Sequence, residues 1–310
     1  MGRPMEAGMT GERKQRMVND DVVDFGSAWS SDKVNGLFER RNILHNWDFT
    51  NPVNQRGQSS YSEPGAYTVD RWRSRSAAAS IELFPGHLSI KGNMSNMPGI
   101  TQILEQDVAN AITGRSATLS ALLKDGTIHS GSGYVGTALN VTYFWIPLHP
   151  EGGTTRARMT LFRNSTGWLS VHIISNDDGS PLEIRRVKLE LGTVSTLAND
   201  PPMDYGRELA VCQRYQLVFP EHVSVPLAMH TPNGLSFLVP TPVTMRISPA
   251  FLPHMLNVSV SNFVPAQNGF MFQLRGVRPN GVSVDANLNG HGLQNAFLVV
   301  HSGTVFDANL

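Results

Sequence analysis

The sequence predicts an all-β protein with two antiparallel β domains and a short helical segment before them. The chain has 310 residues, more than one ordinary compact core requires, so two cores are expected. It also contains 28 Gly and 19 Pro, a content typical of many turns. From residue 42 onward, short runs of β-branched and aromatic residues alternate with turn residues. We expect an N-terminal docking segment, a sandwich, a linker with a short helix, and a second sandwich, at 1–41, 42–195, 196–215 and 216–310.

Composition argues against several classes of function. Lys plus Arg and Asp plus Glu both number 25, so no net charge attracts nucleic acid or an anionic membrane. No apolar run reaches the roughly 20 residues of a membrane span, and we expect synthesis in the cytoplasm. Cys212 stands alone, which excludes an intrachain disulfide framework and a cysteine zinc cluster. We expect no cofactor.

The N-terminal segment carries a helical pattern. Four apolar residues fall on one helical face, namely Val18, Val22, Phe25 and Trp29. A second short helix is expected at 33–41, with Ser31 and Asp32 as candidate N-caps. The segment either forms a docking or trimerising stem or packs on the next domain.

The strand pattern continues through both expected β domains. Residues 113–126 are rich in Ala and Leu, but Gly114 and Gly126 limit the run to strand length, so we favour a strand over a helix. Asp204 is a candidate N-cap for the short helix that precedes the second domain. The strand-like runs are 87–92, 100–106, 116–126, 139–148, 157–164, 168–174, 183–192, 235–240, 244–248, 256–263, 269–276, 281–288 and 296–303.

Three segments resemble a known arrangement. They are NILHNWDFTNPVNQRG at 42–57, YTVDRW at 67–72, and the stretch at 186–215 that ends in Cys-Gln-Arg-Tyr. Together they resemble phage fibre-like virion proteins, in which a jelly roll like a galactose-binding carbohydrate-binding module precedes a terminal β domain. The resemblance covers about half of the chain. It implies recognition of host-surface glycan. It also implies assembly as a trimer, because in such proteins the helix, which ends here at Tyr215, leads into a terminal β domain that commonly trimerises.

A sugar-binding jelly roll needs flat aromatic faces for C–H groups and polar side chains for hydroxyls. Trp72 is expected to be a core residue. Tyr143 and Trp145 should share one face of their strand, opposite Phe144, and that face is either core or binding surface. Trp168 should be exposed beside a turn at Gly167. The candidate glycan-binding residues are Tyr61, Tyr67, Tyr143, Trp145, Trp168, Arg73, Gln102, Asn140 and Arg163.

The resembled jelly rolls often hold a structural calcium ion, for which Asp48 and Glu190 are the candidates here. A solvent-facing position for Glu190 on the closing strand is the alternative, and we predict no metal. A second possible contact is the loop around His291 and Asn295, either a receptor-binding tip or a plain hairpin loop.

Nothing in the sequence favours an enzyme. The acids Asp177 and Asp178 lie in a run typical of a turn and are expected to be solvated rather than paired across a cleft with Glu183 or Glu190. No metalloprotease, hydrolase or phosphate-loop motif is present, and the ten His are scattered. We predict no catalytic residues.

Three hypotheses remain open. The first is a virion subunit (fibre, spike or whisker, on head or tail) that mediates host attachment through glycan and contacts other virion proteins through its N-terminal segment. The second is a purely architectural virion subunit without a ligand. The third is a polysaccharide-degrading enzyme with the jelly roll as an ancillary module.

Trimer formation is directly testable. The apolar stripe and the resemblance predict a native mass of about three times the 34.0 kDa of one chain, measured by light scattering on the purified full-length protein. A clean monomer would contradict a fibre that assembles on its own.

Overall fold

The computed structural model describes most of the chain from residue 41 onward. The helical segment expected at 1–41 therefore lies outside it, apart from Arg41. The described residues are 41–75, 79–92, 98–149, 157–175, 179–231, 234–247, 249–250, 256–261, 264–265, 271–278, 281–287 and 296–308.

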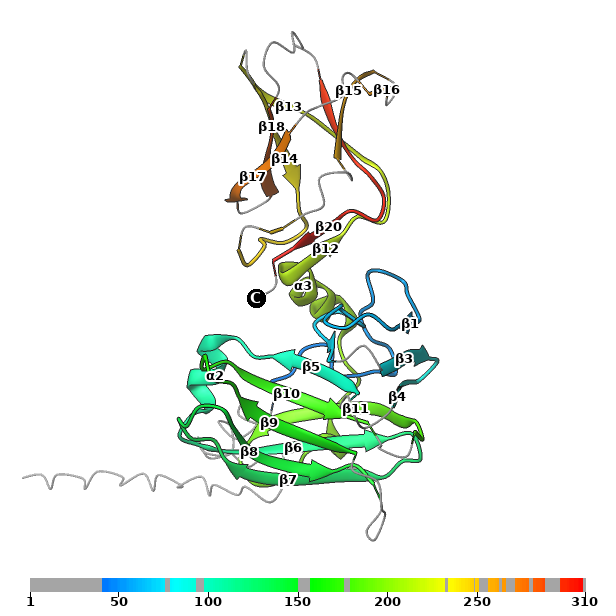
Figure 1. Ribbon diagram of the computed structural model, residues 1–310, viewed down its shortest axis with the longest axis vertical. Coiled ribbons are helices and arrows are strands. Elements are labelled where there is room, and N and C mark those ends of the chain that lie inside the picture. Colours follow the sequence, from blue (N-terminus) through cyan, green and yellow to red (C-terminus); the bar gives the residue numbers. More distant parts are fainter. Residues whose placement is uncertain are drawn as a thin grey trace, which may run out of the picture. The chain divides into compact units, whose positions relative to one another are not determined.

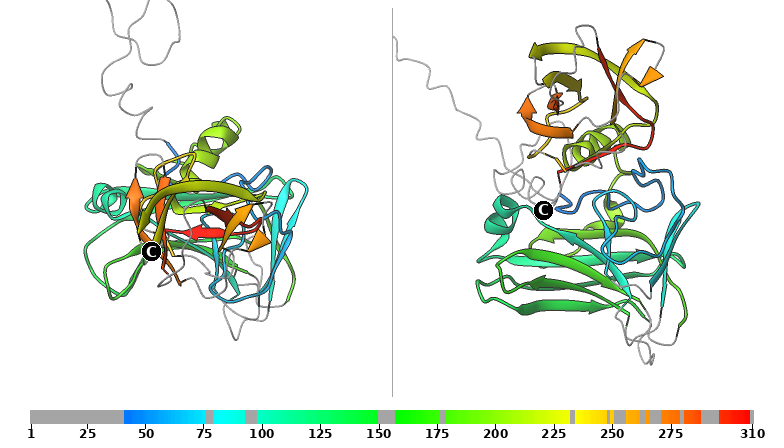
Figure 2. Two further views of the ribbon diagram at one scale, coloured as in Figure 1. Left: turned by 90° about the horizontal axis from the view of Figure 1, so that it is seen from above. Right: turned by 45° about the horizontal axis from the view of Figure 1, so that its top comes forward.

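The first β domain is a sandwich of two antiparallel sheets (Figures 1 and 2). Most of the strands place apolar side chains toward the other sheet, which makes a common core. The six-stranded sheet has the order β1 (Ser60–Tyr61), β3 (Ala79–Phe84), β4 (His87–Gly92), β11 (Leu182–Leu191), β6 (Ser116–Leu123) and β7 (Ile128–Tyr134). The five-stranded sheet has the order β2 (Arg73–Ser74), β5 (Gly99–Ile103), β10 (Leu169–Ile174), β9 (Arg158–Arg163) and β8 (Val141–Pro147).

The second β region is also antiparallel. A long strand, β13, pairs with one neighbour along its first half and with another along its second half. The seven-stranded sheet has the order β16 (Val264–Pro265), β15 (Leu256–Ser261), β19 (Phe297–Val300), β13 (Val223–Thr231), β14 (Gly234–Pro240), β18 (Gly281–Asn287) and β17 (Met271–Arg278). A two-stranded sheet joins β12 (Gln216–Val218) to β20 (Val305–Asp307). The all-β antiparallel class predicted from the sequence is confirmed.

Short helices punctuate the strands. Helix α2 (Gln106–Ile112) follows β5, and a 3₁₀ turn, η2 (Leu197–Asn199), follows β11. Helix α3 (Tyr205–Tyr215) begins after Asp204, whose carboxylate accepts a hydrogen bond from Arg207 N at 3.1 Å. The predicted N-cap of this helix is confirmed, because that carboxylate satisfies a donor left open in the first turn.

Two separate hydrophobic cores form. The sandwich core includes Trp72, which is fully buried as expected and packs edge-on against Phe49 with ring centroids 5.6 Å apart. The second core gathers side chains such as Phe237 and Phe306 from the C-terminal strands.

Several sequence expectations need correction. Residues 244–247 form no strand, although 116–123 form the strand that we favoured over a helix. The run predicted at 100–106 is shorter, because Gln106 already begins α2. Strand β7 was missed because its sequence, IHSGSGY, offers Gly and Ser where a strand usually shows apolar residues.

The glycines of β7 have a packing role. A Cβ atom on Gly131 would lie 2.7 Å from Ile146, and one on Gly133 would lie 2.6 Å from the ring of Phe144. Both neighbours belong to β8, at the adjoining edge of the other sheet. Glycine therefore lets the two sheets approach closely along this edge of the sandwich.

A buried ion cluster fixes the linker to the closing strand. Lys188 Nζ, on β11, lies 2.6 Å from Asp200 Oδ1 and 3.5 Å from Glu190 Oε2, and it donates to Thr196 Oγ1 at 2.7 Å. Glu190 accepts hydrogen bonds from both the backbone N–H and the hydroxyl of Thr196. Glu190 is fully buried, so the expected solvent-facing position is wrong. It is buried because the linker folds back over it.

The cluster should be sensitive to loss of its cation. Lys188→Met leaves two acids without their counter-charge, and we expect unfolding to become easier by about 3–5 kcal/mol in chemical denaturation. Lys124→Met is the matched control. Lys124 pairs with Glu183 at the surface, where such a pair contributes at most about 1 kcal/mol. Equal losses of unfolding free energy in the two variants would show that the buried cluster stabilises the fold no more than the surface pair does.

Candidate functional site

The register of the five-stranded sheet aligns six side chains in one line across its outer face. Tyr67 pairs with Arg73, Arg73 with Thr101, and Thr101 with His172. His172 then pairs with Thr160, and Thr160 with Trp145. Directly paired residues project from the same face of a sheet. We call this line the cross-strand row: Tyr67, Arg73, Thr101, His172, Thr160 and Trp145. At about 4.8 Å per strand it spans roughly 24 Å.

Trp145 forms the exposed end of the row. Its side chain is 58% exposed, whereas Phe144 and Ile146, its neighbours in sequence, pack into the sandwich. A β-bulge between Thr142 and Phe144 interrupts the alternation of β8. The expectation that Tyr143 and Trp145 share one regular face is therefore wrong. Trp145 belongs to the outer surface and not to the core.

His172 occupies the middle of the row and is held in its neutral form. Its Nε2 lies 2.7 Å from Ser170 Oγ, and its ring meets Phe162 edge-on at 5.5 Å. Burial, and secondly the charge of Arg75, lower the pKa of His172 to about 4. The centre of the row therefore offers a neutral imidazole and the half-buried hydroxyl of Thr101, whereas Thr160 is buried. Both accessible groups suit a hydroxylated ligand.

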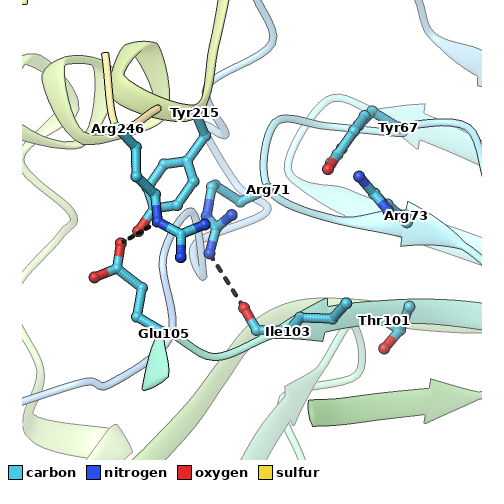
Figure 3. A pocket seen from close by; sticks show the side chains of 8 residues that line it. All are labelled: Tyr67, Arg71, Arg73, Thr101, Ile103, Glu105, Tyr215 and Arg246. Atoms are coloured by element: carbon cyan, nitrogen blue, oxygen red, sulfur yellow. Dashed lines mark hydrogen bonds and ion pairs between the residues drawn. The ribbon is translucent and has the colours of Figure 1, made fainter. Parts of the chain in front are cut away.

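A pocket adjoins the other end of the row (Figure 3). It has a cavity volume of about 20 Å³, room for a single water-sized group. Eight residues line it: Tyr67, Arg71, Arg73, Thr101, Ile103, Glu105, Tyr215 and Arg246. We call it the arginine pocket, because three of these eight side chains are guanidinium groups.

Arginine–tyrosine stacking shapes the pocket. The guanidinium carbon of Arg71 lies 3.5 Å from the ring centre of Tyr215, and that of Arg73 lies 4.4 Å from the ring centre of Tyr67. Arg71 also donates a hydrogen bond to the carbonyl of Ile103 at 3.2 Å (Figure 3). Burial lowers the pKa of Arg71 to about 10, and burial raises that of Tyr67 to about 12. Both groups nevertheless keep their usual forms near neutral pH: the arginine is charged and the tyrosine is not.

A tight turn presents Arg71 and Arg73. Thr68 N donates to Trp72 O at 2.8 Å, and Arg71 has a positive φ of 71°, a backbone conformation uncommon for residues other than glycine. The conformation is supported by the buried ring of Trp72, whose Nε1 donates to Asn46 O at 3.0 Å. The DRW motif therefore acts as a scaffold for the two arginines on either side of the tryptophan.

Asn46 fixes this turn through hydrogen bonds of its side chain. Its side-chain amide donates to the carbonyls of Val53 and Asp70 at 2.8 and 2.7 Å, and its Oδ1 accepts from Val53 N. Its backbone N–H donates to Glu208 of α3 at 2.6 Å. One buried asparagine thus ties the opening segment, the turn and the helix that carries Tyr215.

Four other candidate residues are already engaged within the fold. Tyr61 is buried, with its hydroxyl bonded to Asn54 and Gln58. Gln102 faces inward and exchanges two hydrogen bonds with the backbone of His45. The last two, Arg163 and Tyr143, bond to each other at 3.1 Å, and Arg163 also donates to Gly167 O and Thr113 Oγ1. These groups brace the sandwich and do not join the cross-strand row.

The last two candidates lie in loops. Asn140 is exposed and adopts a positive φ of 53° just before β8. Trp168 follows the turn at Gly167 and is half-buried, less open than expected. Neither belongs to the row, so three of the nine candidates, Tyr67, Arg73 and Trp145, are brought into line.

The acids considered for a calcium ion or for catalysis are either paired with a cationic side chain or lie outside the described residues. Asp48 is buried and pairs with Arg186 Nε at 3.1 Å, so a cationic side chain already occupies the position considered for calcium. Within the described residues, no group of three or more His, Cys, Asp or Glu could hold a metal ion. Asp177, Asp178, His291 and Asn295 lie outside the described residues.

Sequence reasoning missed most of the arginines near the site. Arg71 was hidden inside the DRW motif, and Tyr215 and Arg246 come from distant segments. Thr160 and His172 looked unremarkable because only the strand register shows that they face the same way. Alternation on a single strand could have predicted which face each residue takes, but not its partners.

Comparisons of the chain with protein-family models, with curated proteins and with solved structures gave no match. Among the described residues, no helix has both the length and the apolar character needed to cross a membrane.

The state of His172 can be tested through stability. Because its folded pKa of about 4 lies below the ordinary 6.5, the unfolded chain binds the proton more tightly between these values. Stability should therefore fall by roughly 1–3 kcal/mol as the pH drops from 6.5 to 4. Denaturation at both pH values should show a smaller difference for His172→Gln than for the native chain. His222→Gln serves as the control, and an unchanged difference in His172→Gln would contradict the assignment.

Proposed function

We propose that this chain is a non-enzymatic structural subunit of a phage-like virion that attaches the particle to glycan on the host surface. The observation that supports this function is the cross-strand row, which runs from an arginine–tyrosine pocket to an exposed tryptophan on one sheet face. The resemblance of its opening segment, DRW turn and hinge helix to phage fibre-like proteins supports the virion setting.

The row has the chemistry that an extended sugar chain requires. Trp145 offers an exposed ring against which the C–H face of a pyranose can pack. Thr101, His172 and Arg73 supply hydroxyl, imidazole and guanidinium groups along the path. A span of roughly 24 Å suits several consecutive sugar units better than a single one.

Assembly would give such a site its strength. A homotrimer holds three weak sites together, and this raises avidity without any new contact within a site. In this proposal the N-terminal segment, 1–41, docks on other virion proteins, and the protein is made in the host cytoplasm before it joins the particle.

An architectural role without a ligand is the second candidate, and one observation favours it. Several large apolar side chains are exposed on the single chain, including Val194 at 68%, Met229 at 58% and Leu139 at 56%. Surfaces of this kind are typical of contacts between subunits. The two roles predict opposite effects when Trp145 is removed.

Trp145→Ala distinguishes the two roles. If the row binds glycan, adhesion of the purified protein to host cells should weaken at least severalfold, while the native mass and thermal unfolding stay unchanged. Tyr134→Ala is the matched control, because Tyr134 is an equally exposed aromatic residue on the other sheet. Loss of assembly with adhesion intact would instead support the architectural role.

A further inference from the structure

Arginine is concentrated around one face of a chain that has no net charge. The arginine pocket contains Arg71, Arg73 and Arg246, with Glu105 as its one acid. At the other side of the row, Arg158 lies on β9, and Arg75 directly follows β2. No acidic residue occupies an outward position of the described strands β2, β5, β10, β9 and β8. The face is therefore locally cationic although Lys plus Arg and Asp plus Glu balance at 25 each.

The charge of Arg158 disfavours the charged form of Arg75. The pKa of Arg75 is lowered mainly by burial and secondly by the charge of Arg158. Arg75 Nη1 is also buried with no hydrogen-bond partner among the described residues. Two nearby like charges and an unsatisfied donor are unfavourable in the free protein, and an anionic group between them would relieve both.

The arginine pocket also holds more cationic side chains than acids. Its single acid, Glu105, faces three guanidinium groups: Glu105 Oε1 forms a long ion pair with Arg246 Nε at 3.9 Å and has no hydrogen-bond partner among the described residues (Figure 3). The guanidinium carbon of Arg73 lies 4.4 Å from the ring centre of Tyr67, and a guanidinium carries five N–H donors, so contact with one tyrosine does not use all of them. The pocket excludes a sugar ring and admits one oxygen atom of a small group such as a carboxylate, the rest of which would lie at the mouth of the pocket.

We propose that the ligand of this face is an acidic polysaccharide, whose carboxylate enters the arginine pocket while neighbouring sugars lie along the cross-strand row toward Trp145. This inference rests on the proposed glycan-binding function and names its ligand class. A second carboxylate along the chain would lie between Arg75 and Arg158. Each carboxylate accepts paired N–H bonds from guanidinium groups, the geometry in which arginine binds anions best.

A polysaccharide fits the face better than single-stranded nucleic acid. Nucleic-acid grooves place aromatic side chains at successive positions so that bases can stack. Here the aromatic rings of the row lie only at its two ends, and Arg73 already covers Tyr67. The centre offers a small hydroxyl and a neutral imidazole, which suit sugar hydroxyls.

The experiment is affinity electrophoresis of the full-length protein through gels containing a defined polyanion. The probes are polygalacturonate, alginate, hyaluronate and polysialic acid, each used both as the native polymer and after chemical reduction of its carboxyl groups. We expect at least one native polymer to retard the protein and its reduced form to bind at least tenfold more weakly. Binding should also weaken as salt is added, because charge contacts at the surface are screened.

Matched variants locate the contact. Arg73→Gln and Arg75→Gln should each weaken binding to the native polymer roughly tenfold or more, the usual effect of losing a charge-assisted hydrogen bond. Arg185→Gln, an exposed position on β11 of the other sheet, makes the same charge change and should bind like the native chain. Equal weakening in Arg185→Gln would overturn the site.

The outcomes separate this inference from the function on which it rests. If native and reduced polymers bind equally and Trp145→Ala weakens both, glycan binding stands and the requirement for acid is wrong. If no native polymer retards the protein, the acidic-polysaccharide inference is overturned, whatever the adhesion assay shows. If an oligonucleotide of equal charge competes as well as the polysaccharide, the face binds any polyanion and the inference fails.

Discussion

The site depends on the buried amide of Asn46. The amide donates hydrogen bonds to the backbone carbonyls of Val53 and Asp70. The backbone carbonyl of Asn46 accepts a hydrogen bond from the indole N–H of Trp72. The backbone N–H of Asn46 binds Glu208, so the helix that carries Tyr215 is held by the same residue. A short polar side chain that tolerates a positive φ, here 51°, is needed to serve all of these partners at once. The two arginines beside Trp72 owe their positions to this network.

The site itself arises from strand register rather than from a motif. Six residues from different segments lie on one line because each of five successive pairings, from Tyr67 to Trp145, places its two residues on the same face of the sheet. A slip of one residue in any strand would turn its contribution into the core. The bulge in β8 matters for this reason, since it resets the alternation just before Trp145. The same rigidity that defines the sandwich therefore keeps the cationic pocket and the exposed ring at a fixed separation.

The all-β class, most strands and the cap of α3 could be predicted from the sequence because they depend on local pattern. The core position of Trp72 was recognisable from the DRW motif for the same reason. The arginine pocket was not, since Arg71, Glu105, Tyr215 and Arg246 converge only through tertiary folding. Glu190 was misplaced because strand alternation says nothing about a linker that folds back over the sheet. Local patterns could be read from the sequence, but which residues contact one another could be known only from the folded structure.

The ion cluster of Lys188 also determines how the sandwich carries mechanical load. Asp200 lies 12 residues after Lys188, so tension on the chain beyond the linker reaches Lys188, inside β11, through the ion pair before it can peel the last residues of the strand. Around Lys188, β11 is hydrogen-bonded to β6 on one side and to the opening segment on the other, where Ile43 N donates to Leu189 O and Val187 N donates to Trp47 O. A pull must therefore shear two ladders together instead of opening them one bond at a time. The cluster acts as a clamp that resists extraction of the closing strand under force.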